Sequence, residues 1–281
     1  MPDSQNHTEN PAAPILLGLI AETSIHYGAE AGGGAIDLPV AREAATHYPV
    51  ISGSAFKGSF KDVFGKDSIF TGTTDAAGQL IFSDIRLLLL PVRSLSGSYA
   101  WVTCPLLLER LQRDTQRAGM PAGFHAPNVE DNTYIGPDGM PDLLQLEERQ
   151  FANQTGGIDT PIIAAIQQLI IHPSASQRVE KQLVVLSDND FSWFAQFALP
   201  VNAHNVLDEN KISQNLWYEE TLPPDTVMYG LILPRPTLPQ NIQAEAMKEV
   251  QAKLNDKPYL QIGAGETTGL GWFAHNCRTT R

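Results

Sequence analysis

The stretch "GAIDLPVAREAATHYPVISGSAFKGSF", residues 34 to 60, places a lone acidic residue shortly before a predicted helix. Asp37 follows three consecutive glycines at positions 32 to 34 and is separated from Pro39 by one residue. An aspartate on such a loop commonly closes a turn, and spacing alone favours that role. Its carboxylate could instead act as a base or as one ligand of a hydrated divalent cation such as Mg²⁺. Both roles remain open from the residues alone.

The second half of this stretch predicts an amphipathic helix. Phe56, Phe60 and Val63 recur at steps of four and three and form an apolar stripe. Ser54 stands where an N-cap residue is expected. The segment therefore changes from a glycine-loosened loop to a helix packed on a core.

The predicted start of this helix is a candidate phosphate site. Helix N-termini present free backbone N–H groups and the positive end of the helix dipole. Gly53 and Ser54 lie at that end, and Lys57 and Lys61 follow four residues apart on one face. Arg42 precedes the segment and could join the same patch or pair with nearby acids. An ordinary serine cap with solvated lysines is the simpler alternative.

The composition predicts a globular protein with a sizeable core. The chain has 281 residues, of which 42% are hydrophobic, and a formal net charge of −12. This charge opposes non-specific nucleic-acid binding, so any RNA site must be local. Two widely separated cysteines, Cys104 and Cys277, favour reduced thiols in a reducing compartment.

Targeting and membrane signals are weak in this sequence. The first 13 residues are polar, with no pattern typical of a signal or transit peptide, and predict a disordered arm. The apolar run from Ile85 to Val92 is too short to span a bilayer. We expect a cytoplasmic protein with no membrane partner.

Strand and helix patterns alternate without a fixed repeat. Ile15, Leu17 and Leu19 share one parity and predict a first strand with one face in a core. Further expected elements are one or two strands over 78–94, helices over 104–118, 160–171 and 239–255, an ambiguous segment over 190–199, and a closing strand with a glycine loop. This order favours an α+β fold, with a ferredoxin-like arrangement as the best match.

Two segments are expected to leave this body. Residues 113–160 include many acids, glycines and prolines and predict an exposed insertion. Residues 202–220 predict a protruding hairpin, whose arms include Asn205 and Val206 and whose tip is polar. The remaining residues from 14 to 281 are expected to form a single domain.

The glycine loop from Gly263 to Gly271 differs from nucleotide-binding fingerprints. Its glycines follow G-x-G-x-x-x-G, and no G-K-[ST] follows. A backbone nest or close crossing near a ligand, including Gly265, is the favoured interpretation. A nucleotide-binding enzyme that uses this loop is the alternative from another class. His26 is the one histidine expected near Asp37, although a core or capping role is simpler for it.

Four blocks of this sequence together resemble a known family. The opening stretch resembles the signature of the repeat-associated mysterious protein (RAMP) superfamily, an Ile-Asp-Leu-Pro loop followed by Pro-Val-Ile-x-Gly-Ser-x-x-Lys-Gly. "FSDIRLLLLPVRSLSGSYAWVTCPLLLERL", "LWYEETLPPDTVMY" and "LQIGAGETTGLGW" are similar to further blocks of the repeated backbone subunits of type III-B CRISPR effectors, the Cmr complexes. The resemblance runs from about residue 15 to residue 273.

The resemblance implies a fold and a set of partners. It implies a modified ferredoxin-like (RRM-like) palm with inserted lid or fingers and a thumb hairpin. Copies of the chain would stack into a helical filament along a CRISPR guide RNA, together with other Cmr complex subunits. The filament would cleave complementary single-stranded target RNA at regular intervals. A catalytically silent guide-binding subunit is the alternative within this fold.

The resemblance also implies roles for individual residues. The aspartate of the Ile-Asp-Leu-Pro loop, here Asp37, would cut target RNA in a reaction that requires a divalent metal, with Mg²⁺ expected. The Gly-Ser-x-x-Lys block maps guide-phosphate contacts onto Gly53, Ser54 and Lys57. Further RNA contacts are expected from His26, Arg42, Lys61, Asn205, Val206 and Gly265. Leu270 and Phe60 replace basic residues common in the family, which shifts part of the contact toward Lys61.

Overall fold

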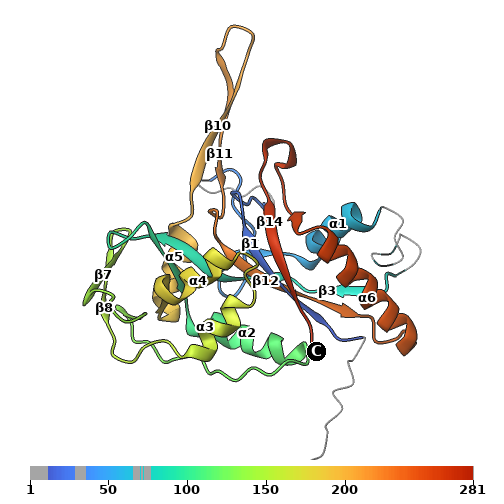
Figure 1. Cartoon of the computed structure of the whole chain (residues 1–281). Helices are drawn as coiled ribbons and strands as arrows, with labels where there is room; N and C mark the ends of the chain where they lie inside the picture. Colours follow the sequence, from blue (N-terminus) through green and yellow to red (C-terminus); the bar gives the residue numbers. More distant parts are fainter. Residues whose placement is uncertain (1–11, 29–35, 66–69, 71, 73–76, 281) are drawn as a thin grey trace, which may run out of the picture.

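One large mixed sheet organises the computed structural model, which describes residues 12–28, 36–65, 70, 72 and 77–280 (Figure 1). The strands are β1 (Ile15–Ala21), β2 (Val50–Ile51), β3 (Leu80–Phe82), β4 (Ile85–Arg93), β5 (Tyr99–Thr103), β6 (Thr133–Ile135), β7 (Leu143–Leu146), β8 (Arg149–Asn153), β9 (Leu183–Leu186), β10 (Val201–Leu207), β11 (Ser213–Glu220), β12 (Val227–Pro234), β13 (Tyr259–Gln261) and β14 (Trp272–Arg278). The helices are α1 (Gly53–Phe64), α2 (Pro105–Arg117), α3 (Thr160–Gln167), α4 (Pro173–Gln182), α5 (Asp188–Phe197) and α6 (Gln240–Asp256). The ambiguous segment over 190–199 is thus mostly helical, and the α+β prediction is confirmed.

The sheet is mainly antiparallel. Within the described chain its strand order is β13-β14-β1-β12-β4-β5-β9-β6-β8-β7, while β2 pairs with β4 and β3 with β12. The pairs β5–β9 and β6–β8 are parallel. The closing strand β14 therefore lies beside the first strand β1, one strand in from the β13 edge of the sheet.

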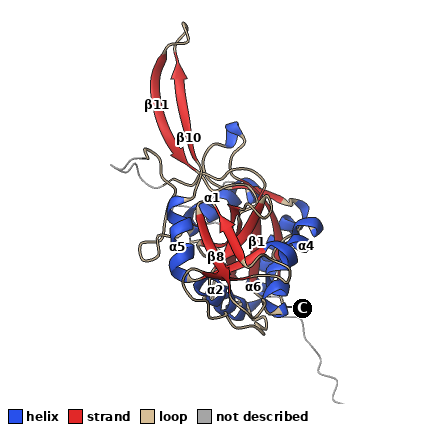
Figure 2. Ribbon diagram, turned by 90° about the vertical axis from the view of Figure 1, so that its left-hand side faces the viewer, coloured by secondary structure: helices blue, strands red, loops and turns tan. Residues whose placement is uncertain are grey.

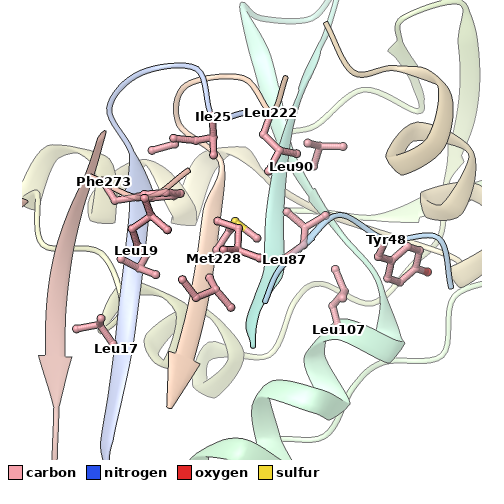
Figure 3. Packing of buried hydrophobic residues seen from close by; sticks show 14 of the residues in the cluster. Leu17, Leu19, Ile25, Tyr48, Leu87, Leu90, Leu107, Leu222, Met228 and Phe273 are labelled. Carbon is pink, nitrogen blue, oxygen red and sulfur yellow. The ribbon is translucent and has the colours of Figure 1, made fainter. Parts of the chain in front are cut away.

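β1 is buried on both faces, whereas its alternation predicted only one buried face. Leu17 and Leu19 enter one core cluster (Figure 3). The same cluster includes side chains from α1 and α6. Leu16 and Ile20 enter a second cluster with side chains from α2, α3 and α4. Helices on both sides of the sheet explain the difference, because a strand between two helical layers needs apolar residues at every position.

The segment predicted as an exposed insertion contributes to the sheet instead. α2 continues through Arg117, and residues 133–153 provide β6, β7 and β8. Tyr134, Leu144 and Phe151 are completely buried. The acids that suggested an insertion lie outside these strands, in the segments that join or flank them, so the expectation of an exposed insertion was wrong for the strands.

The strands β10 and β11 form a separate two-stranded hairpin that projects from the body (Figures 1 and 2). Val201 pairs with Glu220 at its base, and Leu207 pairs with Ser213 near its tip. At the tip, Asp208 accepts hydrogen bonds from the backbone N–H groups of Asn210 and Ile212 at 2.8 and 2.9 Å. The hairpin therefore has an ordered turn although almost all of it is exposed.

Several sequence expectations concern other parts of the chain. Residues 1–11 of the expected disordered arm and the glycines at 32 to 34 lie outside the described residues. Cys104 and Cys277 both carry free thiols, and burial raises the pKa of Cys277 to about 12. No described helix has the length and apolar character needed to cross a bilayer.

Candidate functional site

Asp37 lies at the base of the projecting hairpin, where the loop after β1 runs alongside β11. Its Oδ2 accepts a hydrogen bond from the backbone N–H of Tyr218 at 2.8 Å. Leu38 forms a parallel bridge with Glu219, which holds the adjoining backbone against the hairpin. The Asp37 side chain is exposed, and its partner lies 181 residues away in sequence. Among the described residues, its carboxylate thus closes a long-range contact and not a local turn.

A buried carboxylate anchors the same loop from below. Glu220 Oε2 accepts a hydrogen bond from the backbone N–H of Val40 at 3.0 Å, and Oε1 pairs with the Arg42 guanidinium at 2.7 Å. Arg42 also donates to the carbonyl oxygens of His47 and Ala195. The Glu220 side chain is only 4% exposed. The structure thus gives Arg42, expected to contact RNA, a set of intramolecular partners.

His26 connects the hairpin base with the glycine loop. Its Nδ1–H donates to the backbone carbonyl of Glu220 at 2.8 Å, since a carbonyl can only accept. The His26 carbonyl in turn accepts from the N–H of Ala264 at 2.8 Å. The side chain is buried, at 5% exposed. His26 therefore lies close to the Asp37 loop as expected, in the core-like setting that was the simpler alternative.

Glu219 is a candidate residue that the sequence analysis missed. Its Oε1 is buried and has no hydrogen-bond partner in the described part of the chain. His26 Nδ1 lies 3.9 Å from Oε1, and His204 Nε2 lies 3.9 Å from Oε2. The adjacent pair Glu219-Glu220 was a visible signal, because neighbouring strand residues face opposite sides and two acids then serve two environments.

The N-terminus of α1 differs from the expected phosphate site. Ser52, and not Ser54, is the N-cap residue, and its Oγ accepts from the N–H of Ala55 at 3.3 Å. The Gly53 N–H donates to Asp84 Oδ1 at 2.7 Å. The Asp84 carboxylate therefore already accepts the hydrogen bond that this backbone N–H could give to a phosphate. The Ser54 hydroxyl is exposed and bonds to Ser52 Oγ.

The two lysines of α1 remain available for an anionic partner. Lys57 is half-buried and Lys61 is exposed. Neither forms a salt bridge with another described residue. The hydroxyl of Tyr27 bonds to Ser52 Oγ at 2.6 Å, which connects this helix start to the segment next to His26.

Asn205 and Val206 lie farther out, in the distal half of the hairpin. Val206 is 49% exposed, and Asn205 Oδ1 accepts from the Ser213 hydroxyl at 2.8 Å. Closer to the base, the rings of His204 and Trp217 stack at 5.4 Å with an interplanar angle of 15°. The structure does not bring Asn205 and Val206 to the Asp37 loop.

The glycine loop joins the antiparallel strands β13 and β14 and packs against His26. Gly263 has φ +106°, and a Cβ there would lie 2.5 Å from the His26 carbonyl oxygen. Gly265 has φ +75°, and its Cβ would lie 2.8 Å from the Leu270 side chain. Backbone strain and close packing thus explain both glycines. A strand-to-strand loop also lacks the long following helix of a dinucleotide or P-loop site.

The side chains around Asp37 offer few ligands for a divalent cation. No cluster of three or more His, Cys, Asp or Glu side chains that could hold a metal ion occurs in the described ranges. Mg²⁺ commonly binds through one or two protein carboxylates together with water and substrate phosphates. Asp37 therefore fits as a single protein ligand, with the remaining ligands from outside the chain.

Comparison with known families identifies the architecture. The RAMP superfamily model matches residues 19–274. The chain belongs to the RAMP superfamily. It is 34% identical over 278 residues to the CRISPR system Cmr endoribonuclease Cmr4 of Pyrococcus furiosus, covering 92% of this chain and 93% of that protein.

Solved structures agree with this assignment over nearly the whole chain. Oligomeric Cmr4 from Pyrococcus furiosus superposes with a TM-score of 0.76 at 29% identity, covering 96% of this chain and 99% of the other. A chain of the type III-B Cmr-beta complex bound to cognate target RNA has the same fold, with a TM-score of 0.72 at 19% identity over 94% of this chain and 96% of that one. This RAMP is therefore a homologue of Cmr4, and the family predicted from the sequence blocks is confirmed.

Proposed function

We propose that this RAMP chain is the repeated backbone subunit of a type III-B CRISPR effector, which binds guide RNA and cleaves complementary single-stranded RNA. Its homology to Cmr4 over 92% of the chain supports this assignment. The expected partners are a guide RNA, a target RNA, further copies of the chain and other Cmr subunits. The solved oligomer of the homologous Cmr4 supports self-assembly as part of this proposal.

The exposed Asp37 carboxylate at the hairpin base carries the catalytic part of the proposal. Its backbone is fixed against β11 on the side of Leu38, while its Oδ1 has no partner in the described structure. We infer that Asp37 takes the proton of a target 2′-hydroxyl. The 2′-oxygen attacks the adjacent phosphorus, the bond to the 5′-oxygen breaks, and the leaving 5′-oxygen takes a proton from water. The products carry a 2′,3′-cyclic phosphate and a 5′-hydroxyl.

Positioning would supply much of the acceleration in this reaction. A wedge formed by the hairpin would splay a target nucleotide so that its 2′-oxygen lines up with the scissile phosphorus. A bound Mg²⁺ would stabilise the charge that develops on the phosphate oxygens. Asp37 is the residue that would hold this ion. The same carboxylate is thus the candidate for both roles, general base and metal ligand.

The residues around α1 and the glycine loop complete the proposed RNA surface. Lys57 and Lys61 would contact guide phosphates by charge, and the exposed Ser54 hydroxyl would add a hydrogen bond. The Gly53 N–H is occupied by Asp84, so Gly53 would serve packing and not phosphate binding. His26, Arg42 and Gly265 would support the site from within, through the contacts described above. Asn205 and Val206 would meet RNA only along the outer hairpin.

The products of target cleavage test this function. The complex is reconstituted with the full chain, its sister subunits and one guide, and then given an end-labelled complementary RNA. We expect products that differ by a constant number of nucleotides and carry the end groups named above. Their loss when the chelator EDTA is added would support the metal dependence. Target that binds and stays uncut under all conditions would favour the catalytically silent alternative.

A further inference from the structure

A cavity of about 340 Å³ lies between α1 and the β13–β14 hairpin. It is distinct from the Asp37 loop, and none of the roles proposed above uses it. Two aromatic rings, a lysine, an amide and a carboxylate line this cavity beside an apolar flank of α1. These lining residues are Tyr259, Trp272, Lys257, Gln261, Glu266 and Val63.

Both aromatic side chains at the cavity are unusually exposed for their size. Tyr259 is 48% and Trp272 is 37% exposed. Gln261 stands opposite Trp272 in the antiparallel pair, and Tyr259 lies two residues before Gln261. Since alternate residues of a strand share a face, Tyr259 and Trp272 are diagonal neighbours on the same side of the sheet edge. Two aromatic rings therefore flank one cavity.

The polar groups complement the rings in the way that a nucleotide requires. Lys257 is exposed and has no ion pair with any described residue, so its ammonium is free to meet a phosphate. The Gln261 NH₂ group already donates to the Gly263 and Leu270 carbonyls, which leaves its amide oxygen as an acceptor. The Glu266 carboxylate is a second acceptor. Acceptors suit base amino groups and ribose hydroxyls.

The glycine loop links the cavity to the segment that packs beside the proposed cleavage site. Trp272 follows that loop, and its backbone N–H donates to the Thr23 hydroxyl at 3.2 Å. At the other end of the loop, the Ala264 N–H bonds to the carbonyl of His26, close to Asp37. One short segment thus joins the two sites, so RNA that crosses the loop would reach both.

We propose that this cavity binds one unpaired nucleotide of single-stranded RNA, with its base stacked on Tyr259 and Trp272 and its phosphate beside Lys257. The inference rests on the proposed RNA-binding function and adds a subsite to it. Aromatic stacking tolerates any base, so the subsite would contribute affinity without reading sequence.

The test compares a normal RNA with one that lacks a base. Fluorescence anisotropy measures binding by the full chain, assembled with its sister subunits, of a labelled guide RNA and of guide RNAs of the same length in which one abasic site is moved along the strand. For Trp272→Ala and Tyr259→Ala we expect an increase in Kd of about tenfold on normal RNA. On the RNA whose abasic site coincides with the cavity, the wild type should already be weakened and the variants should lose little more. Trp272→Phe should restore most of the affinity.

Controls separate this inference from the proposed function and from an interface between copies. Leu143→Ala removes an apolar side chain that is 61% exposed on β7, at the opposite edge of the sheet, and should leave Kd unchanged. Absence of guide-RNA binding by the wild-type complex would overturn the proposed function itself. Normal RNA binding by both cavity variants would overturn only the subsite. An equal loss on normal and abasic RNA, or a loss explained by weaker self-association in sedimentation, would also overturn it.

Discussion

At the scale of single residues, the position of Asp37 depends on contacts made far away in sequence. The Tyr218 N–H holds one carboxylate oxygen, and Glu220 fixes the loop two residues beyond Leu38 through the Val40 N–H. A short exposed loop would otherwise sample many conformations, at a cost of about 1–2 kcal/mol for each residue that is ordered. The hairpin base supplies that order.

The Arg42–Glu220 pair should therefore be important for stability. Glu220→Gln leaves the Arg42 guanidinium, which is only 18% exposed, without its counter-charge. We expect the free energy of unfolding to fall by about 3 kcal/mol. Urea unfolding of the full chain measures it. Glu147→Gln is the matched control, because it breaks the pair with Arg93, which is 69% exposed, and should cost less than about 1 kcal/mol. Equal effects of the two substitutions would contradict this view of the loop.

Sequence reasoning reached some of these residues and missed others for a physical reason. Asp37 could be singled out because local glycines and a proline mark its loop. Glu220 could not, because its partners Val40 and Arg42 lie 180 and 178 residues away. Ser54 was mistaken for the N-cap because Ser52 and Ser54 both suit the role, and helix ends are uncertain by about two residues.

At the scale of elements, α1 depends on a close approach to the end of β3. A Cβ at Gly53 would lie 2.5 Å from the backbone carbonyl oxygen of Phe82. A Cβ at Gly58, on the same helix, would meet nothing within 4 Å. A side chain at Gly53 would therefore clash with the backbone, whereas a side chain at Gly58 would point into open space.

These glycines give a matched pair of predictions. Gly53→Ala should lower the free energy of unfolding by about 1–3 kcal/mol, because backbone must move to admit the methyl group. Gly58→Ala should raise it by about 0.5–1 kcal/mol, because alanine is the better helix former. Thermal unfolding in parallel measures both. If both substitutions changed the free energy of unfolding in the same direction, the described packing of α1 against Phe82 would be contradicted.

The elements that the sequence predicted best are those with long apolar periods. The helices α2, α3 and α6 were expected from such patterns; α2 and α6 lie within one residue of the predicted ends, whereas α3 ends at Gln167, four residues before the predicted end. The strands β6 to β8 were missed because each has only three to five residues, too short for a period to stand out among the surrounding acids. Burial of Tyr134 and Phe151 depends on their pairing with β9 and β7, which no local pattern reveals.

At the scale of the whole molecule, charge and shape point to an assembled state. A net charge of −12 opposes free RNA binding, whereas the hairpin carries exposed apolar side chains far from either core. Val206, Leu216 and Tyr218 are each more than 40% exposed. An isolated hairpin is marginally stable in water, so contacts with RNA and neighbouring subunits would stabilise it. The surface chemistry therefore agrees with a subunit that works inside a larger complex.

Target cleavage by an Asp37→Asn complex tests the central claim most directly. Asparagine keeps the shape and an oxygen acceptor for the Tyr218 N–H but removes the negative charge. We expect the cleavage rate to fall at least about a hundredfold while target binding stays within about twofold. Asp138→Asn, which changes an exposed loop aspartate elsewhere, should cut normally. A complex with Asp37→Asn that cuts at the wild-type rate and spacing would contradict the account.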